Sequence, residues 1–199
     1  MQQAWAERAA AFLVWRRSGH VAGRLGLAVA AACFVGLLSQ LKLYLPFTPV
    51  VFSGQTFGVL LVGGLCGMEI GVIGMSLYLV LGIAGMPWFA DAAAGARFAC
   101  SPTAGYLVGF VAAAALVGYI TDRLPAARRF APAAGIMVSG SALILATGFL
   151  GLVVFFGMGA RSAFVAGVVP FIPGDVVKSV VAALMLSTAF GRADGPPEG

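Results

Sequence analysis

Long apolar stretches alternate with short clusters of charged residues along the whole chain. Charged side chains are absent from 25–41, 43–68, 70–90, 98–121 and 130–160, and the stretch 162–191 contains only Asp175 and Lys178. A helix that crosses a hydrocarbon layer about 30 Å thick needs about 20 residues. Most of these stretches are that long, and they lack the apolar–polar alternation of a transmembrane β-strand. The pattern therefore predicts membrane-spanning helices.

The expected fold class is all-α: a polytopic membrane protein, a bundle of six transmembrane helices with ordered outer loops. Charges, glycines and prolines place the helices at 24–43, 55–67, 69–85, 103–122, 133–157 and 174–190. The second helix would reach only about 20 Å, short of the full hydrocarbon depth. Before it, Pro46 and Pro49 disfavour a helix and predict an irregular loop that dips into the bundle.

Composition agrees with one transmembrane domain. Hydrophobic residues make up 61% of the chain and charged residues 10%, too few charges to cover a water-soluble domain. We expect the domain at 24–191, an amphipathic cytoplasmic segment at 1–23 and a disordered tail at 192–199. The net charge of +5 is spread over the ends of segments and forms no patch, so no nucleic acid partner is expected.

The basic residues predict how the chain is oriented in the membrane. Lys42, Arg97 and Arg161 fall on one side of the expected helices, with Lys178 inside the last apolar stretch. The other side holds most of the basic residues, namely Arg8, Arg16, Arg17, Arg24, Arg123, Arg128, Arg129 and Arg192. Because lysine and arginine are enriched in cytoplasmic loops, both termini are expected in the cytoplasm.

Asp175 and Lys178 are the clearest candidates for chemistry. Ionisable residues within a membrane segment are costly and indicate function by default. At a spacing of three they share one helical face, where they offer a carboxylate acceptor beside an ammonium donor. That pair suits a urea-like group. The alternative is structural: Asp175 caps the helix, and Lys178 pairs with it while reaching outward.

Arg97 and several aromatic residues fall in the same outer region. The Arg97 guanidinium can hold a carboxylate with two hydrogen bonds, or it can pair with Asp91 at the rim. The aromatic residues would wall an apolar pocket or form an interfacial belt, and they are Phe47, Phe52, Phe57, Trp88, Phe89 and Tyr106.

Sequence motifs for cofactors and catalysis are missing. His20 is the single histidine, without the spacing of a metal site, and no Walker A or GxGxxG loop occurs. An intramembrane aspartyl protease needs two facing acids, and only Asp175 qualifies. We therefore expect no cofactor, no metal and no enzymatic activity, and any step driven by ATP would need partner subunits.

Three segments in this order and spacing resemble the BioY family, the biotin-specific substrate-binding (S) component of energy-coupling-factor (ECF) vitamin transporters. They are PFTP at 46–49 with QTFGVLL at 55–61, GMPWFA at 85–90 with SPTAGY at 101–106, and PFIPGDVVK at 170–178. The resemblance covers nearly the whole chain from the first expected helix to the last.

The resemblance implies a six-helix bundle in a prokaryotic cell (inner) membrane that captures biotin from outside. It implies ECF partners, a coupling transmembrane subunit and two ATPase subunits, and it assigns the ureido ring of biotin to Asp175 and Lys178. The other expected substrate-binding residues are Phe47, Thr48, Gln55, Trp88, Arg97 and Tyr106. Two alternatives stay open, a biotin transporter that works alone and a membrane assembly subunit without a ligand.

The first expected helix carries small residues at a spacing of four. Ala28 and Ala32 are followed by Gly36, a face that permits close approach of another helix. The resemblance implies that Ala28 and Ala32 dock the coupling subunit. Packing within the bundle explains the same pattern equally well.

Overall fold

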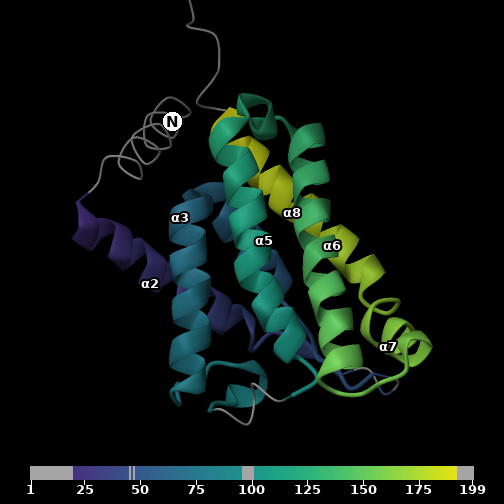
Figure 1. Ribbon diagram of the computed structural model, residues 1–199. Coiled ribbons are helices and arrows are strands. Elements are labelled where there is room, and N and C mark those ends of the chain that lie inside the picture. The colour runs from purple at the N-terminus through teal and green to yellow at the C-terminus, as the bar shows by residue number, and fades with distance from the viewer. Residues whose placement is uncertain (1–19, 45, 47, 96–100, 192–199) are drawn as a thin grey trace, which may run out of the picture.

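A computed structural model describes residues 20–44, 46, 48–95 and 101–191 (Figure 1). The expected tail at 192–199 and most of the leader at 1–23 lie outside these residues. In chain order the elements are α2 (Val21–Leu38), β1 (Lys42–Leu43), β2 (Phe52–Ser53), α3 (Gln55–Ile83), η1 (Ala90–Ala92), α5 (Ala104–Arg123), η2 (Pro125–Arg128), α6 (Phe130–Val154), α7 (Ala160–Gly167) and α8 (Ile172–Gly191).

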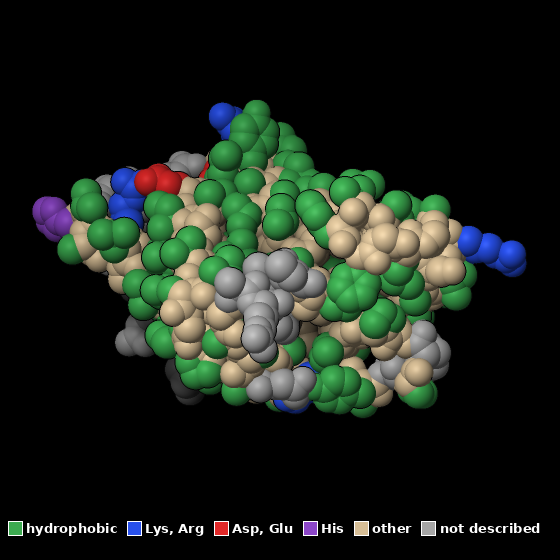
Figure 2. All heavy atoms as spheres, turned by 60° about the horizontal axis from the view of Figure 1, so that its bottom comes forward, with side chains coloured by type: hydrophobic (Ala, Val, Ile, Leu, Met, Phe, Trp, Pro, Cys, Tyr) green, Lys and Arg blue, Asp and Glu red, His purple; other side chains and the backbone are tan. Residues whose placement is uncertain are grey.

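Five helices of the described chain are long and apolar enough to cross a membrane: α2, α3, α5, α6 and α8. The helices predicted at 55–67 and 69–85 both fall within α3, which consists of two helices joined by a kink at Gly67, so the six expected helices correspond to these five elements. A count of six membrane-spanning helices is not confirmed. The helical, polytopic architecture itself agrees with the sequence. Exposed side chains such as Leu37 and Val154 are apolar, and Figure 2 shows hydrophobic side chains spread over the visible face with charges at its margins.

The element α3 consists of two arms that fold back at Gly67. Gly67 has φ 80° and ψ 178°, which only glycine adopts readily. A Cβ atom added to Gly71 would lie 3.6 Å from Gly63 Cα, whereas a straight helix would separate these residues by about 12 Å. The two arms, 55–66 and 68–83, therefore lie against each other, each shorter than a full membrane span.

The end of α5 holds this fold-back in place. The Asp122 carboxylate accepts a hydrogen bond of 2.9 Å from the Met68 backbone N–H, which is otherwise free at the start of the second arm. A Cβ on Gly118 would come within 2.5 Å of the Gly67 and Met68 backbone, so the contact requires glycine. Arg24 of α2 forms a salt bridge with Glu69 at the same place.

The long helices run between two ends of the molecule, which we name after Arg24 and Lys42. The Arg24 end contains the start of α2, the bend of α3, the end of α5 and the start of α6, together with Arg123 and Arg129. The Lys42 end contains the β1–β2 pair, the start of α5, the α6–α7 connection and the start of α8, together with Arg161. Among the described residues, the basic side chains therefore divide between the two ends as the sequence predicts.

The Lys42 end is more ordered than an irregular loop. Residues before and after 44–51 pair as a short antiparallel ladder, Lys42 with Ser53 and Leu43 with Phe52. The helix α7, which the sequence did not predict, lies beside the end of α6 (Figure 1). The larger buried apolar cluster lies at this end and includes Tyr78, Phe89, Tyr106 and Phe171.

Candidate ligand-binding site

Asp175 and Lys178 lie together in the first turns of α8, at the Lys42 end. Lys178 Nζ is 3.2 Å from Asp175 Oδ1, and both side chains are largely buried, with 14% and 5% exposed. An acidic residue in the first turn is also favoured by the helix dipole. The spacing of three thus produces the shared face that the sequence predicts. The structural alternative has Lys178 reaching outward, whereas its side chain is largely buried here.

Each oxygen of the Asp175 carboxylate has a different partner. Lys178 donates to Oδ1, and the Ser141 hydroxyl of α6 donates to Oδ2 at 3.1 Å. Charge-assisted hydrogen bonds of this kind are stronger than neutral ones, and burial strengthens them further. Ser141 was missed in the sequence, because one serine in an apolar helix carries no signal about a partner 34 residues away.

Aromatic side chains cover the Lys178 ammonium group. Its Nζ lies 3.7 Å from the centre of the Phe52 ring, a cation–π contact, and Phe52 stacks on Phe171 with ring centroids 5.9 Å apart. Tyr106 packs on Phe171 and donates a hydrogen bond of 2.6 Å to the Gly167 carbonyl. The β1–β2 pair thus places an aromatic cover on a buried charge.

A small cavity lies beneath this cover. Its volume is about 40 Å³, and its lining comes from the Lys42 end of the bundle and includes Val50, Ser53, Gln55, Tyr106, Leu107, Ile144, Phe171, Asp175 and Lys178. A few waters fit such a space, whereas ligand pockets have roughly 300–1,000 Å³. A ligand of two fused rings would need the side chains that line the cavity to move.

The predicted site residues divide into three groups. Gln55, Tyr106, Asp175 and Lys178 meet around the cavity. Thr48 does not line it, and its hydroxyl instead accepts a hydrogen bond of 3.1 Å from Val50 N–H within the loop. Trp88 does not line it either. Phe47 and Arg97 lie outside the described residues.

Trp88 instead belongs to a network that ties the outer loops to the helices. Its indole N–H donates to the Tyr78 carbonyl at 3.0 Å, and its own carbonyl accepts from Ser39 of α2 at 2.5 Å. The Tyr78 hydroxyl accepts a hydrogen bond of 2.7 Å from the Gln55 amide, whose oxygen accepts from Ser53 at 2.7 Å. The Gln55 amide is therefore held in one orientation at the cavity wall.

Ala28 and Ala32 face the inside of the bundle. Both are buried, and a Cβ on Gly74 of α3 would meet the Ala28 carbonyl oxygen at 3.1 Å. This is the close helix packing that was the alternative to partner docking. The surface that α2 leaves free carries larger apolar side chains, among them Val29 and Leu37.

Comparisons with known proteins show to which family the chain belongs. The sequence profile of the BioY family matches residues 9–193. A protein named biotin transporter BioY from Rhizobium etli is 35% identical over 79% of this chain and 89% of its own. One of the same name from Thermotoga maritima is 35% identical over 71% of this chain and 81% of its own.

A solved structure shares the fold. It is the crystal structure of the S-component for biotin from an ECF-type ABC transporter, with a TM-score of 0.78 at 22% identity, and the match covers 87% of this chain and 93% of that one. Given a profile match over nearly the whole chain and relatives above 30% identity, this chain belongs to the BioY family.

Proposed function

We propose that this chain captures biotin at the Lys42 end and is the substrate-binding subunit of an ECF-type, ATP-driven importer. Membership of the BioY family supports this, as do relatives named biotin transporters. The observation that carries the proposal is the buried pair of Asp175 and Lys178 at the wall of a cavity. The chain has no catalytic activity in this account.

The pair is complementary to the ureido ring of biotin. A carboxylate only accepts hydrogen bonds and an ammonium only donates them, while a cyclic urea donates through N–H and accepts through its carbonyl. Asp175 would therefore take a ring N–H and Lys178 the ring carbonyl. Tyr106 and Phe171 line the same cavity and supply apolar surface for the rings, and Phe52 stacks on Phe171.

High affinity requires the site to close over the ligand. A dissociation constant on the order of nanomolar corresponds to about 12 kcal/mol, or roughly 0.8 kcal/mol for each heavy atom of biotin. Such efficiency needs nearly complete burial of the ligand. In this account the loops at 46–55 and 87–97 close over the rings. Phe47, Thr48, Trp88 and Arg97 in these loops then contact the ligand.

The partners follow from what the chain lacks. Its sequence has no nucleotide-binding motif, so ATP is used by two ATPase subunits that act through a coupling transmembrane subunit. The protein lies in a prokaryotic cell membrane with both termini and the Arg24 end in the cytoplasm. The coupling subunit docks in this account on α2, on the exposed face that carries Val29 and Leu37, because Ala28 and Ala32 are buried against α3.

Calorimetry on the purified protein in detergent tests the proposal. Biotin should bind one to one, without ATP, and much more tightly than other vitamins. No binding of biotin would refute the proposal and favour the structural subunit. Uptake by vesicles that contain this chain alone, compared with vesicles that also contain the partner subunits, separates the stand-alone transporter from the ECF subunit.

A further inference from the structure

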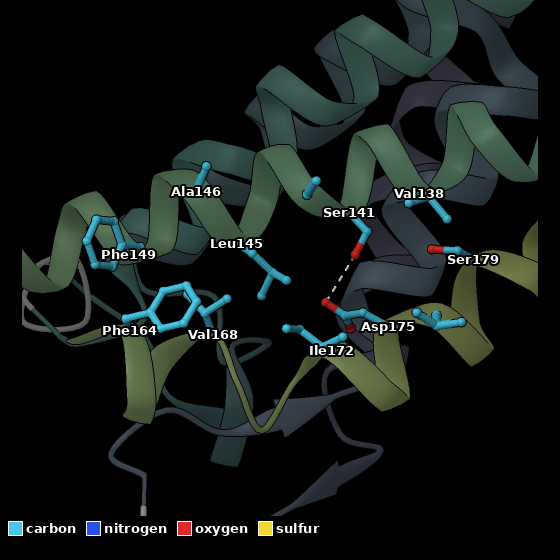
Figure 3. Close-up of a pocket in the computed structure, with 12 residues that line it drawn as sticks. Val138, Ser141, Leu145, Ala146, Phe149, Phe164, Val168, Ile172, Asp175 and Ser179 are labelled. Atoms are coloured by element: carbon cyan, nitrogen blue, oxygen red, sulfur yellow. Dashed lines mark hydrogen bonds between the residues drawn. The ribbon is translucent and has the colours of Figure 1, made fainter. Parts of the chain in front are cut away.

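Asp175 forms part of a thin wall between two hollows. One is the small cavity lined by Tyr106, Phe171 and Lys178, and the other is an apolar groove of about 500 Å³ between α6, α7 and α8 (Figure 3). Leu145 and Asp175 are the described residues that border both. The Asp175 carboxylate therefore has space on either side and needs contacts that fix its direction.

Those contacts come from opposite sides of the wall. Lys178 borders the cavity and donates to Oδ1, whereas Ser141 borders the groove and donates to Oδ2. Figure 3 shows the Ser141 hydroxyl directed from α6 at the carboxylate on α8. The carboxylate is thus held between a cation on the cavity side and a hydroxyl on the groove side.

A second hydroxyl lies on the groove side and is unused. The Ser179 side chain is completely buried, borders the groove and has no hydrogen-bond partner. It follows Asp175 by four residues and so lies on the same face of α8. Without Ser141, the Asp175 Oδ2 atom would lose its partner, and the carboxylate could turn toward Ser179.

We propose that Ser141 is a positioning residue for ligand binding, whose hydroxyl holds Asp175 Oδ2 so that the carboxylate faces the cavity. This rests on the proposed capture of biotin in that cavity. Ser141 itself does not line the cavity and does not touch the ligand. Its contribution is the direction of the acceptor that meets the ring N–H, because a misdirected hydrogen bond weakens steeply with angle.

Three variants test this proposal by calorimetry with biotin. Ser141→Ala should bind about 10-fold more weakly or worse, the loss typical of a hydrogen bond to a charged group. Ser141→Thr keeps the hydroxyl, and its added methyl group has room in the groove, so its affinity should stay within about threefold of wild type. Ser179→Ala is the matched control, because it removes a hydroxyl without a partner, and it should bind like wild type.

Thermal unfolding of each variant separates positioning from stability. If Ser141→Ala does not fold, Ser141→Cys replaces it, because cysteine keeps the size and is a weaker hydrogen-bond donor. Ser141→Cys should then also bind biotin more weakly than Ser141→Thr. Wild-type affinity in the alanine or cysteine variant would overturn the proposal, as would a threonine variant as weak as alanine. Failure of the wild-type protein to bind biotin would instead count against the proposed function.

Discussion

Phe52 is the side chain that covers the Lys178 ammonium group. Its ring lies on the Lys178 ammonium group and on Phe171, so it shields the buried charges from water. Gly174 leaves the space for it, since a Cβ there would come within 2.2 Å of the ring. In the proposed account, a ligand carbonyl that accepts a hydrogen bond from Lys178 shares this ammonium group with the Phe52 ring, which helps to keep water from the contact.

Phe52→Ala should therefore let bound biotin dissociate faster from the closed site. Loss of a desolvated cation–π contact and of ring burial is worth about 1–2 kcal/mol, so biotin should dissociate roughly tenfold faster. Stopped-flow displacement of bound biotin measures this rate. Phe155→Ala, at an exposed position after α6, is the control and should leave the rate unchanged. An unchanged rate in Phe52→Ala would show that the ring is not part of the closure.

Residue by residue, the sequence predicts only what local spacing determines. Asp175 and Lys178 share a face because they are three apart on one helix, and that spacing alone brings them together. Ser141 and Phe52 join them through the packing of α6 and β2 against α8, which no local pattern contains. Trp88 was expected at the ligand, and this stays a prediction; its indole N–H donates to the Tyr78 carbonyl, a contact that the sequence did not reveal.

Among the elements, the fold-back of α3 sets the geometry of the bundle. It brings Gln55, at the start of the first arm, and Tyr78, in the second arm, to the same end of the molecule, where they form a hydrogen bond of 2.7 Å. The bend depends on Gly67 at a positive φ and on the Asp122 carboxylate that accepts from Met68 N–H. Stability and site geometry are therefore coupled through this turn.

Gly67→Ala should destabilise the protein. A side chain in the left-handed region costs about 1–2 kcal/mol, and the close backbone of Gly118 leaves little freedom to relax. Thermal unfolding in detergent should show a lower midpoint. Gly135→Ala in α6, where an added Cβ meets nothing within 4 Å, is the control and should be neutral or slightly stabilising. Equal midpoints for the two variants would mean that the bend tolerates a side chain.

The helices were predicted well where their ends carry signals. The predicted 103–122 and 174–190 agree within two residues with α5 and α8. The two helices expected at 55–67 and 69–85 correspond to the two arms of α3, and the break that the sequence marks near Glu69 lies within two residues of the kink at Gly67. The eight-residue α7 and the two-residue strands were missed, since so short an element depends on its neighbours.

For the whole molecule, the distribution of charge predicts the topology. Arg24, Arg123 and Arg129 lie at one end of the bundle, and Lys42 and Arg161 lie at the other. Arg8, Arg16 and Arg17 precede the described residues, so the bias expected from the full sequence is stronger than that of the described part. The positive-inside rule then predicts that the candidate site lies on the outer side.

Labelling of single cysteines checks this orientation. With Cys33, Cys66 and Cys100 replaced, Arg161→Cys at the Lys42 end should react with an impermeant maleimide in intact cells. Ala126→Cys, in the exposed connection between α5 and α6, should react only after the cells are permeabilised. The reverse pattern would place the site in the cytoplasm and would rule out capture of the vitamin from outside.

The most direct measurement of the central claim is titration of Asp175→Asn and Lys178→Ala with biotin, beside two controls. Each change leaves the other charge buried without its opposite charge and removes one of the proposed contacts to the ureido ring, so affinity should fall about 100-fold or more. Glu69→Gln and Arg161→Ala remove charges away from the cavity and should bind like wild type. If both folded site variants keep wild-type affinity, Asp175 and Lys178 do not hold the vitamin.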